Sequence, residues 1–363
     1  MVAIPTFPLL GLPDDEVLRT LRVMDLEQIL NFSLISKRCK ELVTSIKIKV
    51  TSINIIIVDE IDILIETVSS QLRLSYYTEQ DMYWGMGAYG WKKKLLTPRN
   101  VEVNVFDNGL PSTLGFTLTN SELALTDWLK HLLDIFNYNG IDSMRFFEGS
   151  SNFDIDDIRE VFGNKSKFYM QFLPSDAYKQ LILEKFFPIE KLSIMMSNFE
   201  DSNIPPSFLI QNFEYLCIED LFHEEVITLD ELLMTNSKGI GIDGMSPKDF
   251  NKFIKLWQQG SNPNMECLSI SYRNDRGDEF GRVVIYDEYN VPNTIMKGIK
   301  HDVVPANRIR KFKSVESKNP RLVHGGMDIH RKDGVKATIQ TERMQFSTVW
   351  HMYVWFNHCV VES

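Results

Sequence analysis

A repeat of 24 residues in the middle of the chain restricts the possible folds more than any other feature. Short apolar segments begin at equal intervals, with one last interval of 28 residues, at Met144, Phe168, Leu192, Leu216, Ile240 and Leu268. Each segment has a second apolar residue two positions later, which is the spacing of side chains on one face of a β-strand. These second residues are Phe146, Met170, Ile194, Ile218, Ile242 and Ile270.

Helical patterns occupy the spaces between these strands, as in "SDAYKQLILEKFF", "TLDELLMTNS" and "SPKDFNKFIKLWQQG". One strand and one helix in a period of this length are typical of a leucine-rich-repeat type solenoid. No asparagine ladder follows the strands, because the fifth position after the leading residue holds Gly149, Leu173, Ser197, Leu221 and Met245. We therefore expect an irregular, leucine-rich-repeat-like strand–helix solenoid over residues 121–272.

Both flanks of the repeat carry strand patterns. Before it, Ile53, Ile55 and Ile57 begin an alternation that predicts a β-rich linker over residues 48–120. After it, "GRVVIYDEY" and "STVWHMYVWF" read as strands, and Asp333 and Gly334 lie in the turn of a predicted hairpin. Residues 273–363 are thus expected to form a C-terminal β-rich cap, and the whole chain belongs to the α/β class.

Composition and charge exclude several classes of function. The net charge of −10 argues against an electrostatic nucleic-acid binder. One basic segment, with Arg308, Arg310, Lys311 and Lys313, is interpreted as a solvated strand or loop, with a nuclear signal as the alternative. The N-terminus has no basic region before an apolar run, and no apolar run is long enough to cross a bilayer. We expect a soluble cytoplasmic and/or nuclear protein that is not secreted and binds neither membrane nor nucleic acid.

No motif indicates catalysis, a metal or a cofactor. The "GMGAYG" loop at 85–90 matches a dinucleotide fingerprint but lacks the strand and helix that such a site needs. The four cysteines form no CxxC pair, and the seven histidines, His223 beside Glu224 and Glu225 included, have no metal-ligand spacing. Asp154, Asp156 and Asp157 are interpreted as a solvated helix start. We expect no catalytic residues, no metal and no cofactor.

The first forty residues predict three short helices. Pro13 and the acidic residues after it suit a helix start, Asp25 and Gln28 form a capping-box pair, and a third helix starts near Ser36. Helices this short cannot enclose all of the apolar side chains that they carry. Some of these side chains must pack on the following β region, and a remaining face would be an interaction surface.

This stretch resembles an F-box over residues 7–47. The elements that carry the resemblance are Leu12-Pro13, Val17, Leu18, Leu21, Asp25, Ile29, Leu30, the segment "FSLISKRC" and Leu42-Val43. The chain departs from the pattern at Cys39, where an aromatic residue is frequent, and in the Arg22-Val23-Met24 end of the first helix. Neither departure removes the apolar face.

A second stretch, residues 228–270, resembles the type 2 F-box-associated domain of nematode F-box proteins. Asn236-Ser237-Lys238, Trp257 and Gly260-Ser261-Asn262-Pro263 carry this resemblance. Both modules occur here in the order of that family. The combination is more specific than either module alone.

The resemblance implies a non-catalytic substrate receptor of an SCF-type ubiquitin ligase. The F-box would bind a Skp-family adaptor, and through it cullin and RING subunits. The residues expected at the adaptor contact are Leu12, Pro13, Leu18, Leu21, Ile29, Leu30 and Leu34. The alternative is an F-box scaffold, or a competitor for the adaptor, that acts outside a ubiquitin ligase.

A protein target would contact the strand face opposite the inward apolar pairs. That face mixes aromatic, polar and acidic groups, which suits a protein better than nucleic acid. The expected target-binding residues are Arg145, Phe147, Tyr169, Gln171, Ser193, Met195, Glu219, Asp243, Ser269 and Ser271. The alternative is a face that is merely solvated.

Overall fold

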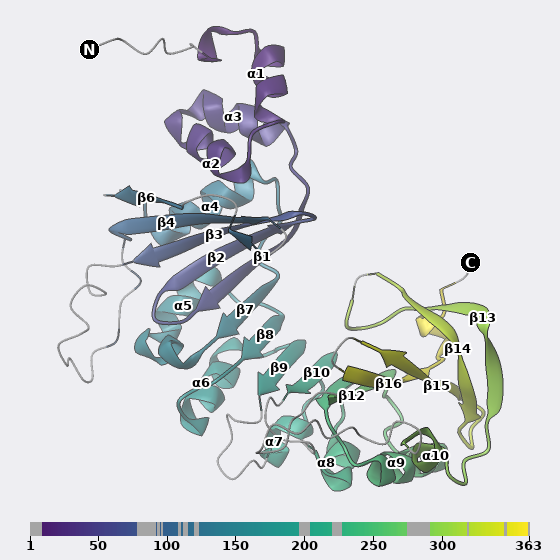
Figure 1. The fold of residues 1–363 in the computed structure, drawn as a ribbon. Coiled ribbons are helices and arrows are strands. Elements are labelled where there is room, and N and C mark those ends of the chain that lie inside the picture. Colours follow the sequence, from purple (N-terminus) through teal and green to yellow (C-terminus); the bar gives the residue numbers. More distant parts are fainter. Residues whose placement is uncertain are drawn as a thin grey trace, which may run out of the picture. The chain divides into compact units, whose positions relative to one another are not determined.

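The computed structural model describes residues 9–77, 92, 95, 97–107, 110–111, 115–119, 123–195, 204–219, 227–273, 291–317, 319–344 and 347–361 (Figure 1). The chain forms two compact units. Unit 1 contains Met1–Phe168 and Tyr178–Phe187, and unit 2 contains Tyr169–Ala177 and Pro188–Ser363. The glycine-rich loop at 85–90, the strand predicted at 281–289 and the histidine at 223 with its two glutamates lie outside the described residues.

Three helices begin unit 1, after a 3-10 turn at Leu9–Gly11: α1 (Asp14–Leu21), α2 (Leu26–Ile35) and α3 (Lys37–Ser45). The predicted capping box of α2 and the predicted start of a third helix near Ser36 are confirmed. Asp25 accepts from the Gln28 amide at 2.8 Å, and the Gln28 side chain accepts from the Asp25 amide at 3.3 Å. Ser36 accepts from the Cys39 amide at 3.2 Å. Each cap satisfies amides that the first helical turn leaves without a partner.

The sheet of unit 1 is an antiparallel meander extended by one parallel strand. Its strands are β1 (Val50–Ile57), β2 (Ile61–Thr67), β3 (Ser70–Tyr77) and β4 (Asn100–Asp107), with the short β5 (Leu110–Pro111) and β6 (Phe116–Thr119) paired to β4. The first repeat strand, β7 (Ser143–Phe146), pairs in parallel with β1, so that Met144 lies opposite Ile55. The predicted β-rich region and the repeat therefore share one sheet.

Helices α4 (Leu125–Ile135), α5 (Ile155–Phe162) and α6 (Asp176–Phe186) and the 3-10 helix η4 (Glu148–Asn152) complete unit 1. Asp154 caps α5 by accepting from the Asp156 amide at 2.9 Å, which confirms the acidic cluster as a helix start. The rings of Phe146, Phe168 and Phe186 meet with centroids 5.1–6.0 Å apart. Repeat residues and a helix thus share one aromatic core. Strand β8 (Lys167–Met170) spans the boundary of the two units.

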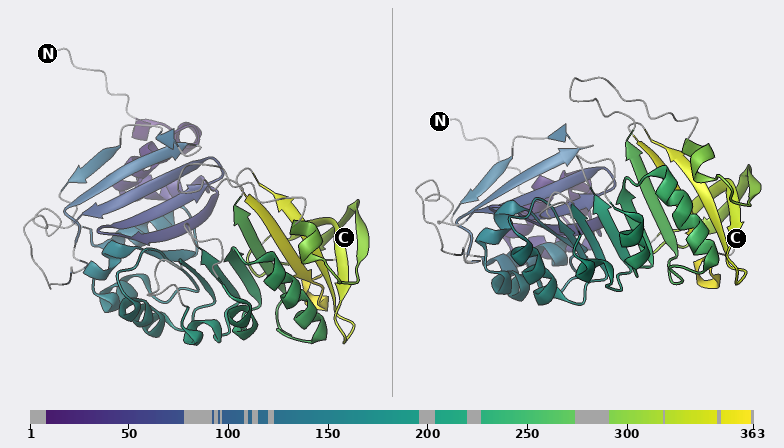
Figure 2. Two further views of the ribbon diagram at one scale, coloured as in Figure 1. Left: turned by 60° about the horizontal axis from the view of Figure 1, so that its bottom comes forward. Right: turned by 90° about the horizontal axis from the view of Figure 1, so that it is seen from below.

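Unit 2 contains four parallel strands: β9 (Lys191–Met195), β10 (Tyr215–Glu219), β11 (Gly239–Asp243) and β12 (Cys267–Arg273). They pair in register, with the leading residues Leu192, Leu216, Ile240 and Leu268 side by side. Helices α7 (Pro206–Leu209), α8 (Leu229–Met234) and α9 (Pro247–Gln259) lie along one face of these strands (Figure 2).

Contacts between equivalent positions join neighbouring repeats in unit 2. Lys238 and Glu214, which are 24 residues apart, form an ion pair at 2.6 Å. Asn236 donates to Asn212 across the same interval. The sequence period thus corresponds to a spatial repeat over these strands.

The C-terminal strands continue the sheet of unit 2 in antiparallel order. After α10 (Val291–Ile295) come β13 (Asp302–Phe312), β14 (Arg321–His330), β15 (Lys336–Arg343) and β16 (Ser347–Val354), and then a 3-10 helix at Asn357–Cys359. The order is β13-β14-β15-β16-β12, so β16 covers the free edge of the last repeat strand. The predicted hairpin is confirmed, with Gly334 at φ +88° in its turn. The basic segment covers the end of β13 and the residue after it: Arg308, Lys311 and Lys313 are exposed, and Arg310 is half-buried.

The mixed α/β class, with N-terminal helices before a large β-sheet, is confirmed. The parallel repeat strands lie within a sheet that also has antiparallel strands in each unit. A leucine-rich-repeat-like solenoid, and the division into residues 7–47, 48–120, 121–272 and 273–363, stay predictions. In the described ranges no helix combines the length and apolar character that a membrane span requires.

Candidate interaction surfaces

The three N-terminal helices bury one side against each other and against the rest of unit 1. Their buried side chains are Val17, Leu21, Leu26, Ile29, Leu30, Phe32, Cys39, Leu42 and Val43. Residues of α2 contact β4, and residues of α3 contact α4. The following β region and α4 therefore cover part of the apolar surface that the helices cannot enclose, as the sequence predicts.

Polar contacts fix the helices on α4. The hydroxyl of Ser33 lies 2.8 Å from Nε2 of His131, and Lys40 pairs with Asp134 at 2.7 Å. Burial and the nearby Lys40 charge lower the pKa of His131 to about 4, although Asp134 opposes the shift. The ring is therefore neutral at pH 7, and its side chain also contacts the Trp128 ring edge-on.

Another set of apolar side chains on these helices stays in contact with solvent. Ile35, at the end of α2, is 64% exposed, and Val23, between α1 and α2, is 84% exposed. Leu10 is also exposed, and Leu9, Leu12, Leu18, Met24 and Leu34 are half-buried. Large apolar side chains with this much exposure are candidates for a protein-binding surface.

The residues expected at the adaptor contact divide into two groups. Pro13 is exposed, and Leu12, Leu18 and Leu34 are half-buried, so these four can touch a partner directly. Leu21, Ile29 and Leu30 are buried in the isolated chain. In this conformation they support the helices rather than face a partner. The sequence reasoning omitted Val23, which lies in the turn between α1 and α2, and Ile35, which a helical wheel of α2 places opposite the buried stripe.

The second candidate surface is the face of the unit 2 sheet opposite the inward apolar pairs. On this face the register aligns Ser193, Cys217, Gly241 and Ser269 in one row across four strands. A second row includes Met195 opposite Glu219, and Asp243 opposite Ser271. The structure therefore brings together six of the residues expected at the target surface: Ser193, Met195, Glu219, Asp243, Ser269 and Ser271.

Part of this face is covered by the chain itself. Ser193 and Met195 are buried, and Ser193 donates to Glu219 at 2.9 Å. The Tyr215 ring and Val315 lie against Gly239, where an added Cβ would approach them within 2.7 Å. Lys191 donates to the Glu316 carbonyl at 3.3 Å. The open part of the face is thus toward Asp243, Ser269 and Ser271, which are half-buried.

The covered part is acidic. Burial, together with the charges of Glu219, Asp243 and Glu316, raises the pKa of the Cys217 thiol well above its ordinary value. Burial first, and then the neighbouring Cys217 and Glu316, raise the pKa of Tyr215 well above its ordinary value. Both groups are neutral at pH 7, and the surrounding carboxylates give this face a negative potential. A phosphate backbone would be repelled here.

His351 on β16 extends the polar row beyond Ser269. Its Nδ1 lies 2.8 Å from the Ser269 hydroxyl and its Nε2 lies 3.2 Å from Glu342. Burial and the Arg321 charge lower the pKa of His351 to about 4, against the opposing effect of Glu342. A carboxylate can only accept, so the neutral ring donates from Nε2 and accepts the Ser269 hydroxyl at Nδ1. This contact could not be predicted from the sequence, because the two residues are 82 positions apart.

The remaining residues expected at the target surface lie elsewhere. Arg145 and Phe147 are half-buried at and just after β7 in unit 1. Tyr169 and Gln171 are half-buried at the end of β8 and just beyond it, in unit 2. Among the expected residues, those on β9–β12 lie in aligned rows through the strand register.

The motif residues near α9 have structural roles. Gly260 ends α9 in the left-handed conformation with φ +116°. The Asn262 amide donates to the carbonyls of Leu232 and Thr235 at 3.1 and 2.8 Å, which ties the turn after α9 to the end of α8. Trp257 is fully buried, and the Arg331 guanidinium lies 5.4 Å from its ring centroid. These motif residues hold the repeat together rather than forming a site.

Comparisons with known proteins agree with both resemblances. The F-box domain family matches residues 9–51, which contain α1–α3. The F-box associated family matches residues 204–270, from α7 into β12. A curated relative from Caenorhabditis elegans, the F-box associated domain-containing protein sdz-33, is 22% identical over 289 residues, which cover 74% of this chain and 80% of the relative. No solved structure matches the chain significantly.

Proposed function

We propose that this chain, an F-box protein with an F-box-associated domain of the nematode type, is the substrate-recognition subunit of an SCF-type ubiquitin ligase. The F-box would bind a Skp-family adaptor and through it cullin and a RING subunit. The observation that carries the proposal is the exposure of large apolar side chains within the matched F-box: Leu10 before α1, Val23 between α1 and α2, and Ile35 at the end of α2. The receptor would do no covalent chemistry itself.

The contribution of such a receptor is proximity. It holds a target near a charged ubiquitin-conjugating enzyme and so raises the effective concentration of the target's lysines. We assign the adaptor contact to Leu12, Pro13, Leu18 and Leu34, and add Ile35 and Val23 because of their exposure. Leu21, Ile29 and Leu30 would affect adaptor binding indirectly, through the packing of the helices.

We assign target recognition to the open part of the polar face in unit 2. Asp243, Ser269 and Ser271 lie there on adjacent strands, beside the ordered His351 contact. Hydrogen-bonding groups held by a rigid sheet lose little entropy on binding, which favours specific recognition of a protein segment. By charge complementarity, Glu219 and Asp243 favour a neutral or basic segment over an acidic one.

A matched pair of substitutions tests the adaptor contact. Ile35→Asp places a charge on the exposed F-box surface, and Val68→Asp does the same at an aliphatic residue that is 88% exposed in the turn between β2 and β3 of the same unit. We expect Ile35→Asp to weaken binding to a purified Skp-family adaptor by at least about tenfold, and Val68→Asp to have no effect. Equal affinities of the two variants would place the adaptor elsewhere.

A second assay separates the ligase from the alternative roles. The chain, adaptor, cullin and RING subunits are combined with activating and conjugating enzymes, and ubiquitin transfer to the chain itself is followed by mass spectrometry. Transfer that depends on the F-box surface supports the ligase receptor. Tight adaptor binding without cullin recruitment would instead favour the scaffold or competitor.

A further inference from the structure

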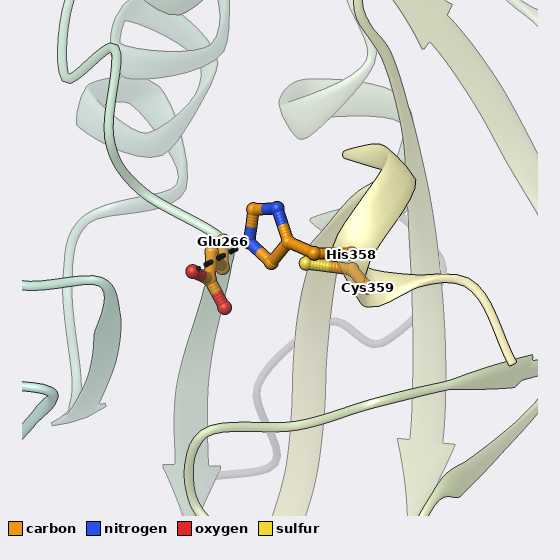
Figure 3. A group of neighbouring side chains, drawn as sticks. All are labelled: Glu266, His358 and Cys359. Atoms are coloured by element: carbon orange, nitrogen blue, oxygen red, sulfur yellow. Dashed lines mark hydrogen bonds and ion pairs between the residues drawn. The ribbon is translucent and has the colours of Figure 1, made fainter.

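Three potential metal ligands meet where the C-terminus returns to β12. They are Glu266, immediately before β12, and His358 and Cys359 in the last 3-10 helix (Figure 3). One ligand atom from each lies within 4.8 Å of the other two. Nε2 of His358 is 2.9 Å from Oε1 of Glu266. Figure 3 shows the three side chains turned toward one another from the two segments.

We propose that Glu266, His358 and Cys359 bind one Zn²⁺ ion. A thiolate, an imidazole and a carboxylate are ligands of zinc, and the sulfur and nitrogen donors disfavour Ca²⁺ and Mg²⁺. Tetrahedral zinc needs its ligand atoms roughly 3–4 Å apart, so the side chains have only a short distance to move. The carboxylate and thiolate charges together would balance those of the cation.

The backbone around the three ligands is already ordered. The Glu266 amide donates to the Lys238 carbonyl at 2.7 Å, and the Glu266 carbonyl accepts from the Val354 amide at 2.8 Å. The Cys359 carbonyl accepts from the Lys313 amide at 2.8 Å. The His358 ring stacks on Phe356, with centroids 5.6 Å apart and planes 5° apart. Binding would therefore require little further ordering of the main chain.

The site has one apolar side and one open side. Cys359 belongs to a buried cluster with Cys267, Phe312, Val323 and Tyr353. The side chain of His358 is 64% exposed, whereas that of Glu266 is 7% exposed. A cation could thus enter from the His358 side, and a water molecule could complete the tetrahedron there.

Zinc at this position would fasten the C-terminal end of the chain. Residues near Cys359 pair with β13: Phe312 and Val360 form a bridge, and the Val361 amide donates to the Lys311 carbonyl at 3.2 Å. The ion would join this segment to the start of β12. The inferred role is structural and is independent of adaptor binding.

Cobalt spectroscopy on the full chain tests the proposal directly. The protein is freed of metal under reducing conditions and titrated with Co²⁺. We expect one Co²⁺ per chain, with the visible bands of a tetrahedral ion and a near-ultraviolet thiolate charge-transfer band, and displacement by Zn²⁺. Absence of these bands with excess Co²⁺ would overturn the proposal.

Variants identify the ligands. Cys359→Ser should abolish the charge-transfer band, and His358→Ala should weaken Zn²⁺ binding by more than about 100-fold, beyond the usual effect of losing an outer-shell partner. Cys39→Ser in α3 and His330→Ala in β14 are the matched controls. They should retain the charge-transfer band and the Zn²⁺ affinity of the unsubstituted chain. A charge-transfer band that persists in Cys359→Ser would overturn the assignment.

A stability measurement covers the case in which Cys359→Ser folds poorly. His358 is exposed, so His358→Ala should leave the metal-free fold intact. Zn²⁺ should raise the melting temperature of the unsubstituted chain and not that of His358→Ala. Equal shifts in the two proteins would exclude His358 as a ligand and overturn the site.

Discussion

The F-box helices and the C-terminal sheet have interiors of different kinds. The helices bury aliphatic side chains, and Ser33 is the buried polar side chain among the described residues of α1–α3. Their ion pair between Arg38 and Asp14 is exposed. The sheet of β12–β16 buries Asp328, Thr338 and His351 within it, and all three have polar partners.

The two kinds of interior should differ in the side-chain substitutions that they tolerate. An apolar interior accepts other side chains of similar volume, whereas a buried polar group needs its specific partner. The F-box can therefore vary while it keeps an exposed binding surface. The C-terminal sheet is fixed by pairs of residues that are distant in sequence, as a rigid recognition surface requires.

The largest expected effect comes from breaking the buried ion pair of the C-terminal sheet. Asp328 accepts from Arg310 at 2.9 and 3.0 Å and from Thr338 at 2.6 Å. Asp328→Ala would leave Arg310 without this partner and should lower the free energy of unfolding of unit 2 by about 3–5 kcal/mol. Urea denaturation measures the loss.

A double-mutant cycle sharpens this result. Arg310→Ala combined with Asp328→Ala should cost less than the sum of the two single changes, because the double variant buries no unpaired charge. Strictly additive losses would show that the two side chains do not depend on each other. The C-terminal sheet would then resemble the F-box in its energetics.

In the F-box, the expected loss of stability depends on the buried volume that a substitution removes, and not on the loss of a polar partner. Leu30→Ala, in the interior of α2, should cost about 2–5 kcal/mol. Ile35→Ala on the same helix removes an exposed side chain and should stay within about 0.5 kcal/mol. Thermal denaturation with hydrogen exchange at α1–α3 measures both. Similar losses would mean that Ile35 is covered in solution.

A moderate pH dependence of stability is expected where the F-box helices pack on α4, because His131 of α4 lies in this contact. The pKa of His131 is about 4 in the folded chain against an ordinary value of 6.5. Between these values the unfolded chain binds a proton that the folded chain does not, so stability falls as the pH falls from about 6.5 to about 4. Allowing for partial exposure of the ring, the loss is about 1 kcal/mol.

The pH effect is measured by urea denaturation at pH 7 and pH 5. His131→Asn should remove the part of the loss seen at α1–α4. The pKa of His351, also about 4, should cause a loss of the same sign in unit 2 that His131→Asn leaves unchanged. An unaltered pH dependence at α1–α4 in this variant would contradict the assignment.

The smallest effects concern the helix ends and surface pairs. Asp25→Ala removes the cap of α2 and should lower the free energy of unfolding by about 1 kcal/mol. Thermal denaturation measures this loss. Arg38→Ala removes the exposed pair with Asp14 and should lower stability by less than Asp25→Ala does, because solvent screens an exposed ion pair. A greater loss for Arg38→Ala than for Asp25→Ala would reverse this order and give surface charge a larger role in the F-box.

Local signals in the sequence predicted the elements accurately. The Asp25–Gln28 pair caps α2 as expected, and helices begin at Ser36 and Asp154, where helix starts were expected. The alternation from Ile53 and the turn at Gly334 likewise predicted strands and a hairpin. Caps, turns and periodicity act over a few residues, so a single sequence contains them.

The exposure of the candidate residues was harder to predict. Leu18 and Leu21 both suit an apolar helix face, yet Leu18 is half-buried and Leu21 is fully buried. Which side of a helix is covered depends on α4 and the sheet, whose positions follow from packing. For the same reason the sequence did not show that Tyr215 and Val315 cover part of the polar sheet face.

Helices, strands, their 24-residue period and the resemblance to two modules could be predicted from the sequence, because these rest on short-range chemistry and spacing. The residues that meet across long intervals became known from the fold alone. It brings Glu266 to His358 over 92 positions and Ser269 to His351 over 82. Such pairs arise from strand order in the sheet, and no spacing rule in one sequence contains that order.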